Sequence, residues 1–108
     1  MTISSDFPDI TNRRIASNGI ELNIAEQGDA GAPLIVMLHG FPESWFSWRH
    51  QFAPLSAAGY HVVAPDMRGY GESDKPSDIS AYNQVEVVND VKGLVAALGY
   101  DTAIGIGH

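Results

Sequence analysis

The sequence predicts an α/β fold in which strands and helices alternate around a mostly parallel sheet. Three short runs of apolar and small residues carry this prediction: LIVML at 34–38, HVVAP at 61–65 and TAIGIG at 102–107. Apolar runs of this kind, bounded by turn residues, are typical of strands covered on both faces. A helical segment lies in each interval between them, so the pattern favours a parallel sheet with right-handed crossovers and helices on both faces.

Composition limits the chain to one modest domain and disfavours some classes of binding partner. The chain has 108 residues, 44% of them hydrophobic, which suffices for a core. Six basic and thirteen acidic residues give a net charge of −7, which disfavours nucleic acid and anionic membrane surfaces as partners. Cysteine is absent, so neither a disulfide framework nor a thiolate site is predicted. The first residues lack the pattern of a secretory signal, and we expect a cytoplasmic protein.

The first elements are an antiparallel hairpin and a buried strand. Asn18-Gly19 separates two short runs in RRIASNGIELNIAEQG, and this dipeptide favours the tight turn of a β-hairpin. GDAGAP then interrupts the pattern before the 34–38 run, which we expect to be an interior strand of the sheet.

Two helices are predicted between the apolar strands. Residues 44–59 form a helical pattern that we expect Pro54 to interrupt, because proline cannot donate to the preceding turn, and Gly59 to end. In the second segment, 83–99, helical spacing places five apolar residues on one predicted buried face, and Gly99 ends it. These five residues are Val85, Val88, Val91, Val95 and Leu98.

Ligands of parallel α/β sheets bind beyond the carboxyl ends of the strands, so the segments after each strand matter most. His39-Gly40-Phe41-Pro42 follows the 34–38 strand, and its glycine and proline fix the direction in which the chain leaves. Local features alone favour a simple tight turn, and the alternative is a loop that directs a backbone N–H, that of Phe41, at a developing oxyanion.

Residues 66–76, DMRGYGESDKP, follow the second strand. Gly69 and Gly71 resemble part of a phosphate loop, but the third glycine and the helix start of a dinucleotide fingerprint are missing. We therefore predict a structural loop in which Asp66 or Arg68 ties the edge of the sheet.

Other polar and aromatic residues receive structural interpretations. The four histidines, His39, His50, His61 and His108, fall on different elements without ligand spacing, so no metal site is predicted. Trp45, Phe46 and Trp48 either line a pocket or anchor the first helix, and we expect packing for at least one. Glu86 and Asp90 are interpreted as a solvated helix face rather than a catalytic pair.

Taken together, the motifs resemble the α/β-hydrolase superfamily, and within it the soluble epoxide hydrolases. HG-x-P after one strand, D-x-R-G-x-G-x-S after the next and a final Gly-His occur here in the order of that family. The resemblance extends over essentially the whole chain, HGFPESWFSWRHQ and DMRGYGESDKP being its most specific parts. It implies that residues 1–108 are the N-terminal part of an α/β-hydrolase core domain whose remainder, with a cap domain, lies outside this sequence.

The resemblance also implies a mechanism and roles for individual residues. In the family, an aspartate after Gly-His attacks an epoxide, and water then hydrolyses the covalent ester to a vicinal diol without a cofactor. Phe41 matches the loop position that supplies one oxyanion N–H group, and Phe41, Pro42 and Trp45 are the expected pocket residues. His39 and Gly40 are expected to orient the loop, and His108 to precede the nucleophile. The expected partners are a small-molecule epoxide and the remainder of the polypeptide.

Two further interpretations stay open. A haloalkane or haloacid dehalogenase shares the aspartate nucleophile, although haloalkane dehalogenases commonly have asparagine where this chain has Phe41. ESWFSW at 43–48 favours the epoxide hydrolase over this rival. A truncated or receptor-like form would use the same scaffold for binding only.

The sequence stops one residue before the expected nucleophile, and a chemically modified aspartate at the next position is the favoured explanation. We also expect an isolated chain 1–108 to be catalytically inactive.

Residues 1–108, prepared alone, are expected to aggregate or to remain partly unfolded, because an open strand edge and apolar faces would be uncovered. Size-exclusion chromatography and thermal melting test this. A monodisperse preparation with one cooperative melting transition would contradict it.

Overall fold

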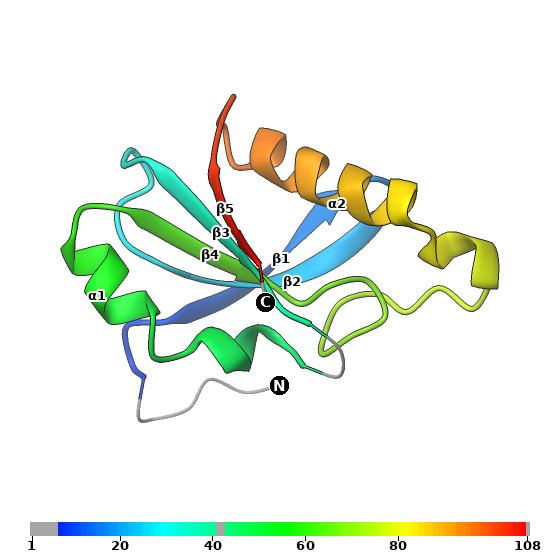
Figure 1. Cartoon of the computed structure of the whole chain (residues 1–108), viewed down its shortest axis with the longest axis horizontal. Helices are drawn as coiled ribbons and strands as arrows, with labels where there is room; N and C mark the ends of the chain where they lie inside the picture. The colour runs from blue at the N-terminus through cyan, green and yellow to red at the C-terminus, as the bar shows by residue number, and fades with distance from the viewer. Residues whose placement is uncertain (1–6, 41–42, 108) are drawn as a thin grey trace.

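A mixed five-stranded sheet organises the computed structural model, which describes residues 7–40 and 43–107 (Figure 1). The spatial order is β1-β2-β4-β3-β5. The strand bounds are Thr11–Ser17 (β1), Ile20–Gln27 (β2), Leu34–Leu38 (β3), His61–Pro65 (β4) and Ile104–Gly107 (β5). The predicted strands at 34–38 and 61–65 are confirmed to the residue, and the third begins two residues later than its apolar run.

The predicted hairpin of β1 and β2 is confirmed. Asn18 and Gly19 both have positive φ, 52° and 79°, as a two-residue hairpin turn requires, and Ser17 pairs with Ile20 across it. β2 also pairs antiparallel with β4, which attaches the hairpin to the rest of the sheet. The β3–β4 and β3–β5 pairings are parallel, so the described residues form a mixed sheet with an N-terminal antiparallel hairpin, as the predicted α/β fold requires.

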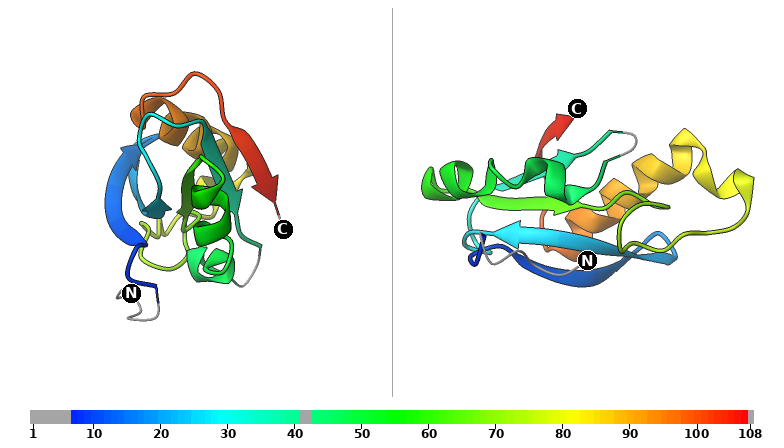
Figure 2. Two further views of the ribbon diagram at one scale, coloured as in Figure 1. Left: turned by 90° about the vertical axis from the view of Figure 1, so that its left-hand side faces the viewer. Right: turned by 90° about the horizontal axis from the view of Figure 1, so that it is seen from below.

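The sheet has an apolar cluster on each face because side chains alternate along its inner strands. Ile35 and Met37 of β3 belong to the cluster under Trp45 and Phe52, whereas Leu34 and Val36 belong to the cluster under Leu94. Each cluster includes a helical residue, which confirms the prediction of helices on both faces. Figure 2 shows β1 and β5 at opposite edges of this covered sheet.

The first helical segment is divided differently from the prediction. A 3₁₀ helix, η1 (Trp45–Trp48), is followed by a turn and by α1 (Phe52–Ala57). The expected interruption at Pro54 is wrong, because Pro54 lies in the first turn of α1, where its missing N–H has no intrahelical partner to lose. Gly59, just after α1, has positive φ and lies where the helix was expected to end.

The second helix forms as predicted but buries a different face. A second 3₁₀ helix, η2 (Ile79–Tyr82), leads into α2 (Gln84–Ala97), whose N-terminus is capped by the Asn83 side chain. Val85 and Val88 are 67% and 56% exposed, whereas Asp90 and Leu94 are buried, so the predicted valine face is wrong in its first half. No described helix is long and apolar enough to cross a membrane.

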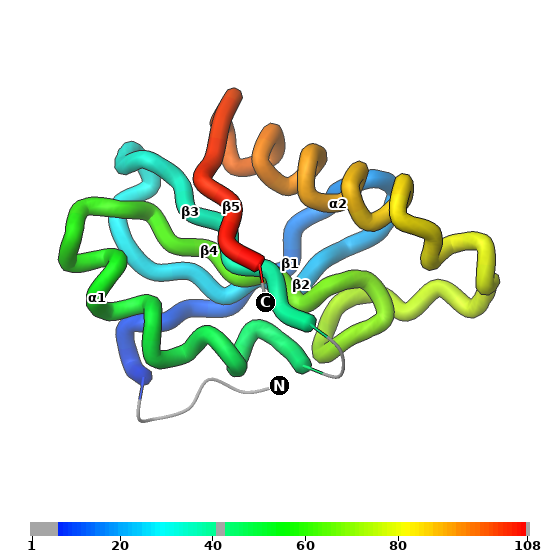
Figure 3. Tube along the Cα trace, viewed as in Figure 1, coloured from blue at the N-terminus to red at the C-terminus, as the bar shows by residue number. Residues whose placement is uncertain are grey.

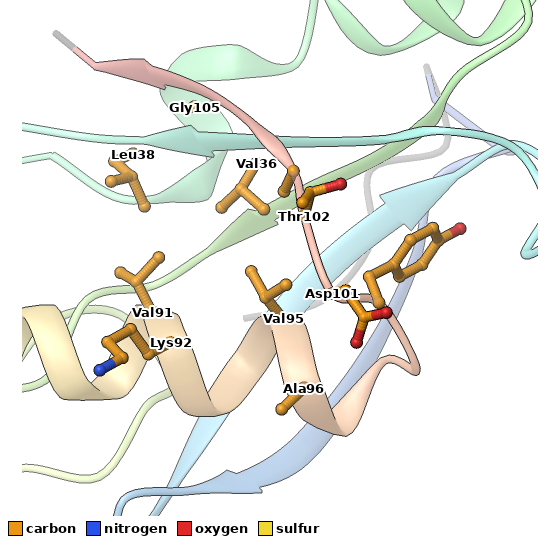
Figure 4. Close-up of a pocket in the computed structure, with 11 residues that line it drawn as sticks. Val36, Leu38, Val91, Lys92, Val95, Ala96, Asp101, Thr102 and Gly105 are labelled. Atoms are coloured by element: carbon orange, nitrogen blue, oxygen red, sulfur yellow. The ribbon is translucent and has the colours of Figure 1, made fainter.

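A groove of about 470 Å³ runs between α2 and the strands β3 and β5. Val91 and Val95 of α2 point toward Val36 and Leu38 of β3, and the opening lies between them (Figure 4). The chain passes from α2 directly into β5 at this place, as the trace in Figure 3 shows. Ile104 of β5 is 49% exposed, so both an apolar groove and the outer side of the last strand are open.

A cluster of hydrogen-bonded polar side chains lies at the end of the sheet where β4 begins. The Glu26 carboxylate of β2 accepts hydrogen bonds from Arg13 Nε at 2.6 Å and from His61 Nε2 at 2.9 Å. Burial acts to raise the pKa of the Glu26 carboxyl, but the bonds from Arg13 and His61 outweigh it, and the net pKa is lowered. The other ring nitrogen of His61 lies 3.1 Å from the Tyr100 hydroxyl.

Replacing Glu26 by glutamine in the full-length protein is expected to lower stability near neutral pH but much less in acid. A lowered pKa means that the carboxylate stabilises the fold above its unfolded-state pKa of about 4.3, and this contribution is lost as pH falls through the folded-state value. Urea unfolding of wild type and Glu26→Gln at about pH 7 and about pH 3 measures the difference. A difference that stays the same at both pH values would show that the Glu26 charge does not contribute.

Candidate active site

The carboxyl ends of β3, β4 and β5 meet at one edge of the sheet. These strands are parallel, and Leu38 at the end of β3 pairs with Gly107 at the end of β5. The segments that follow are His39-Gly40 after β3 and Asp66-Met67-Arg68 after β4. This is the edge at which parallel α/β sheets bind ligands, and it is the candidate site of this chain.

His39 links the segment after β3 to the segment after β4. Its ring is buried, and Nε2 accepts a hydrogen bond from the Met67 N–H at 2.9 Å. Nδ1 lies 2.9 Å from the Gly40 carbonyl, so the proton assigned to Nδ1 is donated to that oxygen. The Tyr70 ring packs edge-on against the imidazole, 5.1 Å away between centroids. Both ring nitrogens are therefore engaged by backbone groups.

Two hydrogen bonds join Gly40 to Glu43. The Glu43 N–H donates to the Gly40 carbonyl at 2.8 Å, and the Gly40 N–H donates to Glu43 Oε1 at 3.1 Å. Gly40 thus has both its backbone groups bound, with the carbonyl shared between His39 and Glu43. The predicted site residues Phe41, Pro42 and His108 lie outside the described residues, so their roles remain predictions.

Trp45 has its side chain in the core. The indole is fully buried, with the Phe52 and Phe46 rings edge-on at 6.1 and 5.4 Å between centroids. This is the packing that we expected for at least one aromatic residue of the first helix. That Trp45 also lines a substrate pocket stays a prediction.

Asp66 is the most densely bonded side chain at this edge. It is fully buried, and Oδ1 accepts from the Trp45 N–H at 2.8 Å. Oδ2 accepts from Asn23 Nδ2 at 3.1 Å and from the Glu72 N–H at 2.9 Å. The carboxylate thereby joins β2, the start of η1 and the loop after β4. The sequence predicted only that Asp66 or Arg68 would bind the edge of the sheet. It could not identify the three donors to Asp66, because they come from distant or irregular segments.

Arg68 and Asp90 form a buried, two-pronged ion pair between the loop after β4 and α2. Arg68 Nε and Nη2 donate to the two oxygens of Asp90, each at 2.7 Å, and Nη1 donates to the Ala81 carbonyl. Hydrogen bonding to Asp90 raises the pKa of the Arg68 guanidinium above its ordinary value. The interpretation of Asp90 as part of a solvated face is wrong, because Asp90 is 2% exposed and satisfied by Arg68.

A cavity of about 300 Å³ opens beside His39 at this edge. Its lining combines backbone and aromatic groups from the loops after β3 and β4 with residues near the start of α2: His39, Gly40, Met67, Arg68, Tyr70, Tyr82 and Val87. Among residues 7–40 and 43–107, no group of three or more histidine or acidic side chains is arranged to hold a metal ion.

Comparisons with known proteins agree on the fold. Residues 33–108 match the model of the α/β hydrolase fold family. Epoxide hydrolase A of Mycobacterium tuberculosis is 46% identical over 98 residues, which are 91% of this chain and 30% of that protein. A Bacillus subtilis protein described as an AB hydrolase superfamily member, YfhM, is 48% identical over 94 residues, or 87% of this chain and 33% of its own.

Solved structures give the same result. The crystal structure of epoxide hydrolase A from Mycobacterium thermoresistibile superposes with a TM-score of 0.90 at 46% identity, over 92% of this chain and 31% of that one. This chain therefore spans about a third of the length of the relatives it matches.

The Arg68–Asp90 pair yields a stability prediction for the full-length protein. Arg68→Met leaves the Asp90 carboxylate buried without its cation, which typically costs about 3–5 kcal/mol of the free energy of unfolding. The double variant Arg68→Met/Asp90→Leu removes both charges and is expected to recover most of that loss. Urea unfolding of both variants measures it. Equal stability of the single and double variants would mean that the unpaired charge is not the cause.

Proposed function

Because this chain belongs to the α/β hydrolase fold family, we propose that it is the N-terminal part of an epoxide hydrolase. One observation supports this activity within the family: 91% of this chain aligns with epoxide hydrolase A at 46% identity. The HG-x-P motif lies within that identity range, and its first residues stand at the carboxyl end of β3 beside the end of β5. The proposal places the oxyanion loop and the nucleophile on adjacent strands.

The proposed reaction has two steps and consumes one water molecule. A carboxylate oxygen of the nucleophilic aspartate, which would follow His108, forms a bond to an epoxide carbon, and the ring C–O bond breaks. Two tyrosines of the cap domain supply the proton that the ring oxygen takes. A water molecule, deprotonated by a histidine with an acidic partner, then attacks the ester carbonyl carbon. Collapse of that intermediate releases the vicinal diol and restores the carboxylate, with the histidine proton returned to the tyrosine through solvent.

This chain would contribute to the second step. The negative oxygen of the tetrahedral intermediate would be held by two backbone N–H groups, of which Phe41 supplies one. Removing one such donor typically slows a working site by about 10²–10³-fold. Pro42 would fix the loop, and Trp45 would lie nearest the substrate pocket. His39 and Gly40 would hold the loop in place through the bonds that they make to Met67 and Glu43.

Further parts of the proposal concern context. The reaction needs no cofactor, since the carboxylate, the tyrosines and water supply all the chemistry. The substrate would be a small epoxide, and the chain would act together with the remainder of its own polypeptide. A cytoplasmic location is also part of the proposal.

A single turnover of the full-length protein with a simple aryl epoxide in ¹⁸O-water tests the proposed reaction. We expect a vicinal diol whose newly added oxygen is unlabelled in the first turnover, because it comes from the carboxylate. Mass spectrometry of the diol and of the intact protein measures the label and the ester adduct.

The same assay separates the alternatives. Halide release from a haloalkane or haloacid, without diol from the epoxide, would identify a dehalogenase. Binding of either compound with no adduct and no product would indicate a non-catalytic relative. Labelled oxygen in the first-turnover diol would contradict the covalent ester.

A further inference from the structure

The loop that begins at His39 is attached to the end of β4 at both of its ends. At its start, His39 Nε2 accepts from the Met67 N–H, and at its far end the Trp45 N–H donates to Asp66 Oδ1 at 2.8 Å. His39 and Trp45 are six residues apart, yet they bind the consecutive residues Met67 and Asp66 just after β4. The sheet pairing of β3 and β4 ends before either anchor, at Val36 opposite Val63.

The Asp66 anchor is itself held rigidly. Oδ2 is fixed by Asn23 from β2 and by the Glu72 N–H from the following loop, and all three donors to the carboxylate are neutral N–H groups. The Ser73 hydroxyl donates to the Asp66 carbonyl at 2.6 Å. Gly71 presses against the same carboxylate, since a Cβ at Gly71 would lie 2.2 Å from Oδ2. Rotation of the carboxylate would break several bonds at once.

We propose that Asp66 is a positioning residue for the reaction: its Oδ1 fixes the backbone of Trp45, at the far end of the segment that begins at His39 and carries the HG-x-P motif. The inference rests on the function proposed above and adds a residue that the sequence motifs did not assign to the reaction. Asp66 touches no reacting atom in this scheme. It acts through the backbone of Trp45. The buried indole holds the side chain in the core, whereas the bond to Oδ1 sets the backbone position, and oxyanion stabilisation depends steeply on geometry.

Asp66→Asn is the informative substitution, because it preserves volume and removes one acceptor oxygen. An asparagine placed with its oxygen at the Oδ1 position would turn its NH₂ toward two donors, Asn23 and Glu72. The opposite orientation turns the NH₂ toward one donor only, the Trp45 N–H. The variant should therefore adopt the second orientation and release the loop anchor while keeping the bonds to β2 and to the loop after β4.

The expected result in the full-length protein is a defect in ester hydrolysis rather than in ester formation. The oxyanion forms only when water attacks the ester, so Asp66→Asn should slow that step by about 10-fold or more, up to the roughly 10²–10³-fold of a lost donor. Rapid-quench mixing with the aryl epoxide, followed by intact mass, measures both steps. The ester adduct should accumulate in the variant, and its rate of formation should stay within about 3-fold of wild type.

Asp90→Asn is the matched control, since Asp90 is a buried carboxylate that contacts Arg68 and Asn18 but no residue of loop 39–45. It is expected to lower the melting temperature without accumulating ester. Equal accumulation in both variants, or hydrolysis at the wild-type rate in Asp66→Asn, would overturn the positioning role. If wild type itself forms neither adduct nor diol, the proposed function fails instead, and the two failures are thus distinguishable.

Hydrogen exchange tests the anchors without relying on catalysis. In wild type, the amides of Trp45 and Met67 should both be protected, because each is bonded to a buried side chain. In Asp66→Asn, Trp45 should lose protection while Met67 keeps it. Should that variant fail to fold, the wild-type measurement still decides: exchange of the Trp45 amide at the rate of a free loop would refute the anchor.

Discussion

The buried carboxylate of Asp66 is the interaction on which the candidate site depends. Sheet hydrogen bonds join β2, β3 and β4, but they end where the strands end, and the segments beyond them need other partners. Asp66 provides these by accepting N–H groups from β2, from the start of η1 and from the loop after β4. A buried carboxylate must be satisfied by donors, so its burial enforces the arrangement of all three segments.

Arg68 extends the same principle to the second face of the sheet. Two residues after Asp66, its guanidinium binds Asp90 and so connects the end of β4 to α2. Asn18 of the hairpin turn donates to the same carboxylate, and Ser17 donates to the Asp90 carbonyl. Gly93 allows this close approach, since a Cβ there would lie 2.3 Å from Ser17 Oγ. The segment after β4 therefore fixes both the candidate loop on one side and the long helix on the other.

Part of the apolar surface is exposed, whereas the polar groups around Asp66 and Arg68 are hydrogen-bonded. The two core clusters bury the inner strands under Trp45, Phe52 and Leu94, but the groove beside β5 and the first turns of α2 stay open. The relatives that this chain matches are about three times its length. A site held by directional bonds near β4 and an open surface near β5 thus coexist in the described residues.

The sequence by itself determined the strands, the hairpin turn and the long second helix, whereas tertiary structure decided which residues these elements contact. Local signals predicted the strands at 34–38 and 61–65 from their apolar runs. Local backbone preference likewise predicted the turn at Asn18-Gly19, and the family motifs can be recognised from short stretches of sequence. Which face of α2 is buried was not local: periodicity favoured Val85 and Val88, yet Asp90 is buried because Arg68 lies opposite it. Likewise, the partners of Asp66 are up to 43 residues away. A polar side chain is buried only where distant donors reach it, and their positions exist only in the folded chain.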